Sequence, residues 1–299
     1  MFSLLQRITD AVRTSLWFIP LLMTGLAVGV AQGLVLLDQT QWLLYSSTVG
    51  KELDDALSVR FPNPRQVADA PVPSAASGYV QFIDTQSLTD MARAAGVVIR
   101  LDCRPGHHLI QGTRIASVSP RSQASDALCG RVNKAFTLGS VRTPAQDVLF
   151  LVNQLVEIAQ RALSPGINDP VTATTCIDQL GAALGRVAAC EMPQPLQADK
   201  DGDLRLVFAQ PDTFKLYLDA ALDPIRGLAR SSTQVSLCLT SLLDQLAQVV
   251  NSKEHKEALL AQAAMIQRGA QAIPEVLDRT AVQADCQRII GVLASRNPH

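Results

Sequence analysis

Hydrophobic positions change their spacing along the chain. An uninterrupted apolar run without any charged residue occupies Ser15–Leu37. Short apolar runs between turn residues follow in 78–140, a pattern that predicts β-strands. From residue 141 onward apolar residues recur at three- and four-residue spacing, which predicts amphipathic helices. In Ala145–Ala162 the predicted core-facing stripe consists of Val148, Leu149, Val152, Leu155, Val156 and Ala159. The predicted fold class is therefore α+β: one N-terminal transmembrane helix, a small β-containing unit, and a mainly α-helical C-terminal domain.

The run Ser15–Leu37 is long enough to cross a membrane. As a helix, its roughly 23 residues rise about 34 Å, against about 30 Å of hydrocarbon. Trp17 at one end, and Trp42 with Tyr45 beyond the other, suit the two membrane–water interfaces. A cleavable signal peptide is the alternative, but the run is too long and lacks a clear small-residue cleavage site. We therefore expect a single-pass anchor with the lipid bilayer as its partner.

Three glycines four residues apart, Gly25, Gly29 and Gly33, share one face of this span. They either reflect the tolerance of membrane helices for glycine or form a packing face for a homo-oligomer. Arg7 and Arg13 precede the span, which predicts a cytoplasmic N-terminus and an external soluble region. The cysteines argue the other way: none forms a CxxC pair, and reduced structural thiols favour a cytosolic face.

Composition excludes some partners. The chain of 299 residues is 47% hydrophobic and 18% charged, with a net charge of −1 and 4% aromatic residues. Without a basic block or stacking aromatics, no nucleic-acid partner is expected. His107 and His108 have no further ligands in a metal motif, so no metal or cofactor is expected. Four cysteines in helical patterns are expected to be core residues: Cys176, Cys190, Cys238 and Cys286.

Arg104–Gly106 is predicted to be a turn, in which proline fixes φ and Gly106 allows a positive φ. Turn and breaker residues divide the chain into four segments. Residues 1–47 are the anchor, 48–77 a juxtamembrane helix and a Pro/Ala-rich linker, 78–140 the β-containing unit, and 141–299 the helical domain. Strands are predicted at Tyr79–Ile83, Val97–Leu101, Leu109–Ile110, Ile115–Val118, Phe136–Gly139 and Leu204–Phe208. Helices are predicted at Thr48–Arg60, Thr85–Ala95, Ala124–Lys134, Ala145–Ala162, Pro170–Ala189, Asp212–Arg230, Thr233–Asn251, Lys253–Gly269 and Pro274–Ser295.

The polar residues of 142–169 are the candidate site. Gln154, Glu157 and Arg161 fall on one helix face, next to a break at Ser164–Pro170. Free N–H groups of the helix that begins at Pro170 would be anion donors there. The simpler alternative is an ordinary pair between Glu157 and Arg161, with the residues of the break merely capping a helix. The candidate ligand-binding residues are Arg142, Gln146, Asp147, Gln154, Glu157, Arg161, Asn168 and Asp169.

Three stretches carry a family resemblance. They are RTSLWFIP at Arg13–Pro20, GYVQFID at Gly78–Asp84 followed by Arg104–Gly106, and a long third stretch that ends in RALSPGINDPVTA at Arg161–Ala173. Through them the chain resembles the bacterial predicted-membrane-protein family known as domain of unknown function 2254. The resemblance implies the inner (cytoplasmic) membrane of a bacterium and no established activity. Family members have about four spans; this chain resembles a shortened member that lacks the middle ones.

Three functions remain open at this point. The leading hypothesis is a membrane-anchored, non-enzymatic binding or assembly module without catalytic residues. The alternative is a regulatory soluble domain of a channel- or transporter-like membrane protein. A membrane-bound hydrolase that uses Glu157, Asp147 or Asp169 as acid or base is the third. It requires these carboxylates to line one concave pocket.

Overall fold

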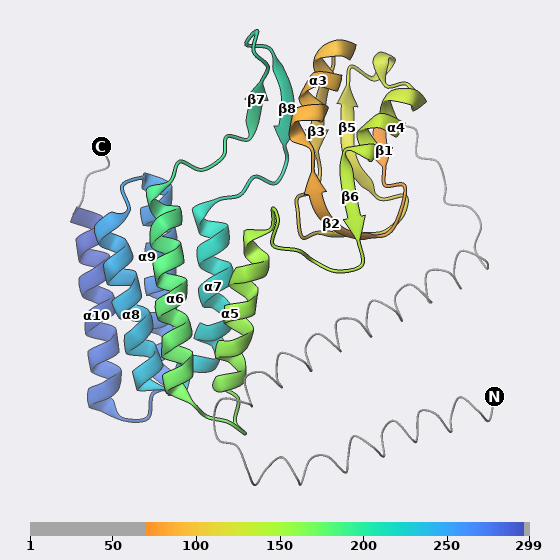
Figure 1. Cartoon of the computed structure of the whole chain (residues 1–299). Helices are drawn as coiled ribbons and strands as arrows, with labels where there is room; N and C mark the ends of the chain where they lie inside the picture. The colour runs from red at the N-terminus through yellow and green to blue at the C-terminus, as the bar shows by residue number, and fades with distance from the viewer. Residues whose placement is uncertain (1–69, 296–299) are drawn as a thin grey trace, which may run out of the picture. The chain divides into compact units, whose positions relative to one another are not determined.

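The computed structural model of the chain describes residues 70–295 (Figure 1). The predicted span with its glycine face, and the predicted helix at Thr48–Arg60, lie outside these residues. The described residues contain eight α-helices and two β-sheets, and their C-terminal part is mostly helical. This confirms the mixed α+β content. None of the helices between residues 70 and 295 is both long enough and apolar enough to cross a membrane.

Two sheets share the first hydrophobic core. The larger has the order β1-β5-β3-β8-β7, and its pairs are antiparallel except for β3 with β8, where Ile99 lies opposite Leu206. The smaller, β4-β2-β6, is antiparallel. The strands span Pro71–Pro73 (β1), Gly78–Ile83 (β2), Val98–Leu101 (β3), His108–Leu109 (β4), Arg114–Ser119 (β5), Phe136–Gly139 (β6), Leu196–Ala198 (β7) and Leu204–Phe208 (β8).

Two short helices, α3 (Thr85–Ala95) and α4 (Asp126–Lys134), cover these sheets. Helix α3 packs on β3 and β8, and α4 packs on β1 and β6. The Asp84 carboxylate begins α3 by accepting the Ser87 N–H at 3.0 Å, and Gly96 ends it with φ +63°. An acceptor before the first turn and a left-handed residue after the last satisfy backbone groups that a helix leaves unpaired. Local sequence therefore sets both ends of α3, as predicted.

Three segments of the sheets differ from the sequence-based expectation. Leu196–Ala198 forms β7, which pairs with β8, in a polar stretch for which no strand was predicted. Arg65–Ser77 was expected to be a linker, but its residues Pro71–Pro73 form β1, with Val72 fully buried opposite Ala116. Proline is tolerated there because β1 is an edge strand and needs few N–H donors. Leu204–Phe208 is a strand as expected, yet it lies within the stretch 141–299 and pairs with β3 of the β-containing unit. Pairing between such distant segments leaves no local signal in the sequence.

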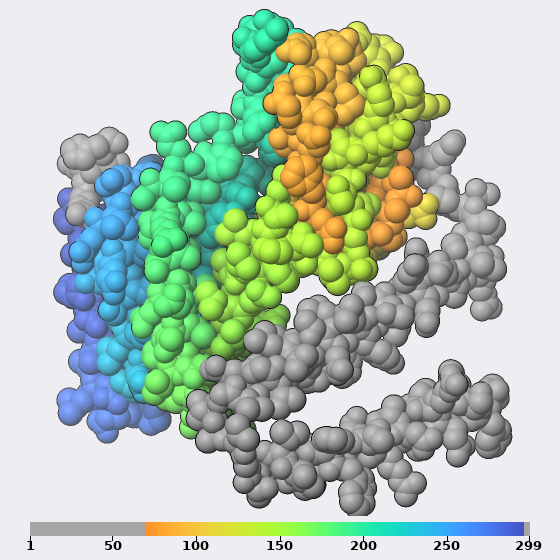
Figure 2. Space-filling model, viewed as in Figure 1, coloured from red at the N-terminus to blue at the C-terminus, as the bar shows by residue number. Residues whose placement is uncertain are grey.

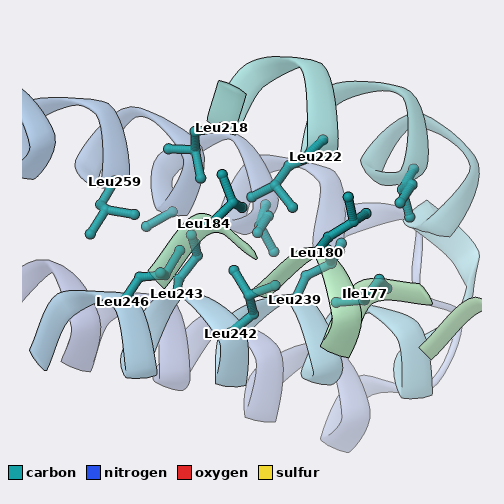
Figure 3. Packing of buried hydrophobic residues seen from close by; sticks show 14 of the residues in the cluster. Ile177, Leu180, Leu184, Leu218, Leu222, Leu239, Leu242, Leu243, Leu246 and Leu259 are labelled. Atoms are coloured by element: carbon teal, nitrogen blue, oxygen red, sulfur yellow. The ribbon is translucent and has the colours of Figure 1, made fainter. Parts of the chain in front are cut away.

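Six of the described helices enclose a second, larger core. Helices α5, α6, α8 and α10 pack in succession, while α7 packs on α5 and α9, and α9 packs on α10. Leucines of α6, α7, α8 and α9 meet in the centre (Figure 3). The helices span Val148–Ala162 (α5), Pro170–Ala189 (α6), Phe214–Leu228 (α7), Thr233–Val249 (α8), Lys253–Gly269 (α9) and Val276–Ser295 (α10).

A buried amide ties α7 to α9. Gln262 has no exposed surface, and its Nε2 donates to Oδ1 of Asp219 and Oδ1 of Asp223, 2.9 Å each. Only the NH₂ group of an amide can donate to two carboxylates, which determines its orientation. The same carboxylates pair with Lys215 and Arg226 on the solvent side. Asp219 and Asp223 therefore have partners on both sides, whereas the buried Oε1 of Gln262 and Nε of Arg226 have no hydrogen-bond partner in the described structure.

All six cysteines are free thiols. Cys176 and Cys286 are buried in the helical core as expected. Cys238 is only half-buried. The expectation for Cys190 is wrong, because it follows the last turn of α6 and is exposed. Burial raises the pKa of the Cys103 thiol, in the β core, to about 12, so this thiol stays protonated at neutral pH.

Candidate functional site

A buried ion pair stands at the start of α5. The Arg142 guanidinium contacts Oδ2 of Asp147 through Nε at 2.8 Å and Nη2 at 2.7 Å, while Oδ1 accepts the Phe150 N–H at 3.1 Å. The Asp147 side chain is 2% exposed and that of Arg142 25%. Asp147 is therefore both the N-cap of α5 and the ion-pair partner of the partly buried Arg142. Removing either side chain of the pair would leave the other charge buried without a partner, which is destabilising.

The turn at Arg104–Gly106 touches this pair. Gly106 has φ +88°, and a Cβ built on it would lie 2.2 Å from Oδ2 of Asp147. The Gly106 N–H donates to the Val80 carbonyl at 2.8 Å, which holds the turn against β2. The sequence predicted a turn with a glycine at positive φ, and this is confirmed. The close approach of Asp147 is a second reason for glycine, and the local sequence did not reveal it.

Gln146 joins the same region to β2. Its Oε1 accepts the Ile83 N–H at 2.8 Å and its Nε2 donates to the Ile83 carbonyl at 3.2 Å. The amide therefore hydrogen-bonds both backbone groups of Ile83, the last residue of β2. The Gln81 Nε2 donates to the Val141 carbonyl at 2.8 Å. The segment between β6 and α5 is thus held to β2 by two side-chain amides.

A second polar cluster lies beside the first. Tyr217 Oη donates to Oδ2 of Asp212 at 2.8 Å, and Arg104 Nη1 lies 3.6 Å from Oδ1 of Asp212. Arg104 Nε donates to Nε2 of His107 at 3.2 Å. Burial, and then the charge of Arg104, lowers the pKa of His107, while burial and the Asp212 hydrogen bond raise the pKa of Tyr217. Both side chains are therefore neutral at pH 7, and Oη of Tyr217 and Nε2 of His107 are already engaged in hydrogen bonds.

We call these residues the joint: Arg104, Gly106, His107, Arg142, Gln146, Asp147, Asp212 and Tyr217. The cavity among them is lined by Arg104, Gln146, Asp147 and Tyr217 with their neighbours, and its volume is about 10 Å³. That is room for one water molecule at most. The joint can hold the sheet region against the first turns of α5 and α7, but it has no space for a small-molecule ligand.

The predicted ligand set is distributed over three places. Arg142, Gln146 and Asp147 belong to the joint. Gln154, Glu157 and Arg161 are exposed along α5. Asn168 and Asp169 follow the last residue of α5. Because α5 is 15 residues long, its two ends are about 22 Å apart. The joint and the break are thus separated by the length of the helix. Binding by the whole set stays a prediction.

The break before α6 is a hydrogen-bonded turn. The Ser164 carbonyl accepts the N–H groups of Ile167 and Asn168, and Asn168 has φ +48°. Oδ1 of Asp169 accepts from Val171 N and Thr172 N at 3.0 and 3.1 Å. Pro170 at N1 and Asp169 as N-cap are confirmed. The anion donors expected at this helix start are not free, because Asp169 occupies them, and the hydrogen bonds from Thr172 lower the pKa of Asp169.

The hydrolase hypothesis required carboxylates in one concave pocket. Asp147 caps α5, Asp169 caps α6, and Glu157 is exposed between them on α5. The three carboxylates lie at two helix caps and on a helix surface. They do not line one concave pocket, which acid–base catalysis by these residues would require.

An apolar line on the outside of α5 was missed by the sequence analysis. Val148 is 49% exposed, Leu151 48% and Ile158 42%, and Leu155 between them is half-buried because it also packs on the helical core. We call these four residues the α5 outer face. Val148 had been assigned to the core, and this is wrong: the buried stripe is Val152, Val156, Ala159 and Ala162. A usable signal existed, since an apolar stripe about 100° wide is enough for a surface helix, whereas the apolar residues of this segment cover about half of the helix circumference.

The apolar exposure continues into the turn that follows. Ile167 is 63% exposed and Val171 64%. Ile167 lies in the turn between α5 and α6 and Val171 in the first turn of α6, and the two helices lie side by side at the surface in Figure 2. The longest motif of the sequence therefore presents several large apolar side chains to the outside.

Comparison with known proteins identifies the class as predicted membrane proteins. A family model described as predicted membrane protein (DUF2254) matches residues 45–245, and the chain belongs to this family. This confirms the resemblance drawn from the motifs. Uncharacterized proteins of Mycobacterium bovis and Mycobacterium tuberculosis are 30% identical over 214 residues, which cover 70% of this chain and 41% of each relative. The chain thus spans about two fifths of the length of these curated relatives. No solved structure matches it.

Proposed function

We propose that the chain is a non-enzymatic assembly module of a membrane protein, and that the α5 outer face is its docking surface for an apolar protein surface. The observation that carries the proposal is the line Val148, Leu151, Leu155 and Ile158, whose exposed members keep 42–49% of their surface in solvent. Leaving such groups in water costs free energy that docking recovers, about 25 cal/mol per Å² of apolar surface covered. Contiguous exposed apolar surface is a mark of interaction sites.

The polar residues support assembly more than ligand binding. The side chains of Gln146, Asp147 and Asp169 accept hydrogen bonds from backbone N–H groups. The cavity within the joint has a volume of about 10 Å³. Small-molecule sites usually have several hundred Å³. Gln154, Glu157 and Arg161 flank the α5 outer face, where polar residues form the rim of a protein interface.

The docking surface can be tested in living cells. A photo-reactive amino acid replaces Leu151 in the full chain, and a second variant carries it at Gln248, which is exposed on α8. Irradiation of the Leu151 variant should give covalent adducts of defined mass that the Gln248 variant lacks. If both variants give the same faint background while remaining folded, the α5 outer face is not a docking surface.

The membrane anchor is part of the proposal. Family membership and the uncharged run Ser15–Leu37 support a single-pass protein of the inner membrane. After lysis without detergent, high-speed centrifugation should leave the full chain in the pellet, and alkaline carbonate should not release it. Recovery in the supernatant would refute the anchor. If the chain stays in the pellet, a reporter fused to the C-terminus determines the side of the membrane that holds the described residues.

The alternative function, a regulatory domain of a channel- or transporter-like protein, stays a prediction. It requires ion or solute flux in liposomes that contain the purified full chain. Flux that persists after substitution of Leu151 would favour this alternative, because assembly through the α5 outer face would then not be the activity of the chain.

A further inference from the structure

The α5 outer face has the spacing of a helix-pairing seam. Helix α5 packs on α6 and α7 through its buried stripe, and the α5 outer face borders that stripe on one side, with Val148, Leu151 and Ile158 exposed and Leu155 partly packed on the core. Val148, Leu151, Leu155 and Ile158 follow each other at steps of three, four and three residues. This is the alternation with which two helices interlock side chains along a seam. The occupant that fits such a line is a helix.

Charge argues against a lipid surface as the occupant. Helices that lie on membranes carry several Lys or Arg residues beside their apolar face. Within α5 the charged residues are Glu157 and Arg161, one of each sign. Both lie in its second half, and no basic flank accompanies the apolar line. Electrostatic attraction to anionic headgroups is therefore absent from this face.

The same arrangement favours a second copy of the chain. In an antiparallel pair related by a two-fold axis, residues near the axis meet their own copies, so a charge there would face a like charge. The midpoint of the line falls between Leu151 and Leu155, where Val152 is buried and Asn153 and Gln154 are uncharged. Leu151 would then face Leu155 of the second copy, and Val148 would face Ile158 of the second copy.

We infer that the α5 outer face pairs antiparallel with that of a second copy of this chain. The inference rests on the proposed function and names its partner. A seam along one 15-residue helix is small for a stable interface between free proteins. Chains held in one membrane meet at a high effective concentration, which makes a small interface sufficient. Ile167 and Val171, at the end of the helix, would add apolar surface to the rim.

Disulfide cross-linking of the full chain in its membrane tests the geometry. The background carries Cys190→Ser, which removes the exposed native thiol. Val148→Cys and Ile158→Cys are expressed singly, and also together as two chains with different tags. In the antiparallel pair, positions 148 of the two copies are displaced by ten residues, about 15 Å, whereas 148 and 158 lie opposite. A disulfide needs Cα atoms within about 7 Å.

The expected result is a mixed-tag dimer when the two variants are co-expressed, and no dimer beyond the Cys190→Ser background from either variant alone. Strong links within each single variant would overturn the antiparallel pairing. Folding of each variant is checked by its circular dichroism spectrum after purification.

Absence of any link from folded variants would overturn the second copy as partner. The photo-reactive variant at Leu151 then separates the two ideas. Adducts that contain a different protein would leave the docking surface intact and remove only the self-pairing, whereas no adduct would remove both.

Discussion

Replacing Gly106 by alanine tests whether the joint depends on close contact between the turn and Asp147. The matched control is Gly202→Ala, because Gly202 has φ +87° and its Cβ would meet nothing within 4 Å, whereas the Cβ at Gly106 would lie 2.2 Å from Oδ2 of Asp147. A non-glycine residue at positive φ costs about 1–2 kcal/mol, and both variants incur this cost.

Only Gly106→Ala must also displace the Asp147 carboxylate. Breaking a buried ion pair costs roughly 3–5 kcal/mol. Because Arg142 keeps 25% of its side chain exposed, we expect the lower end. The free energy of unfolding should therefore fall by about 4–5 kcal/mol in Gly106→Ala and by about 1–2 kcal/mol in Gly202→Ala.

The assay is denaturant unfolding of the full chain in mild detergent, followed by circular dichroism. In an Asp147→Ala background the alanine at 106 meets no carboxylate, so its cost should fall to that of the control. This non-additivity is what a direct contact predicts. Equal shifts of the midpoint for Gly106→Ala and Gly202→Ala, or an undiminished cost in the Asp147→Ala background, would refute the reasoning.

Three further outcomes are expected. Gln262→Glu places a third carboxylate between those of Asp219 and Asp223, so it should lower the unfolding midpoint strongly at pH 7. The decrease should be smaller at pH 4, where a protonated Glu can donate a hydrogen bond as the amide does. The exposed control Gln248→Glu should change the midpoint little at either pH. The pKa of His107 is lowered in the fold, so its protonation favours unfolding: stability should decline as the pH falls below about 6.5, and His107→Gln should reduce that slope in midpoints measured from pH 7.5 to 5. A uniform shift at every pH would contradict this. Deletion of residues 15–37 should move the chain from the membrane pellet to the supernatant; retention in the pellet would show that another segment holds it there.

The candidate site could be predicted only in part, and the reason differs between residues. Asp169 and Pro170 act within one helix turn, so their capping role was visible in the sequence. Gly106 was recognised as a turn residue, but its contact with Asp147 joins a turn to a helix some 40 positions later. Gln146 was singled out as a ligand candidate, whereas its amide pairs with the backbone of Ile83. A polar side chain in a motif has the same appearance whether it faces a ligand or a strand.

The sequence by itself determined the local elements. Apolar periodicity, the caps at Asp84 and Asp169, and the turn at Gly106 act over a few residues, and within residues 70–295 the helices and strands they predict are present with small shifts of their ends. Tertiary structure alone decided that β8 joins β3, that Val72 is buried, and that one apolar line of α5 is covered while the other is not. Periodicity reports that a side chain is apolar, but only packing between segments distant in the chain decides which apolar surface is removed from water.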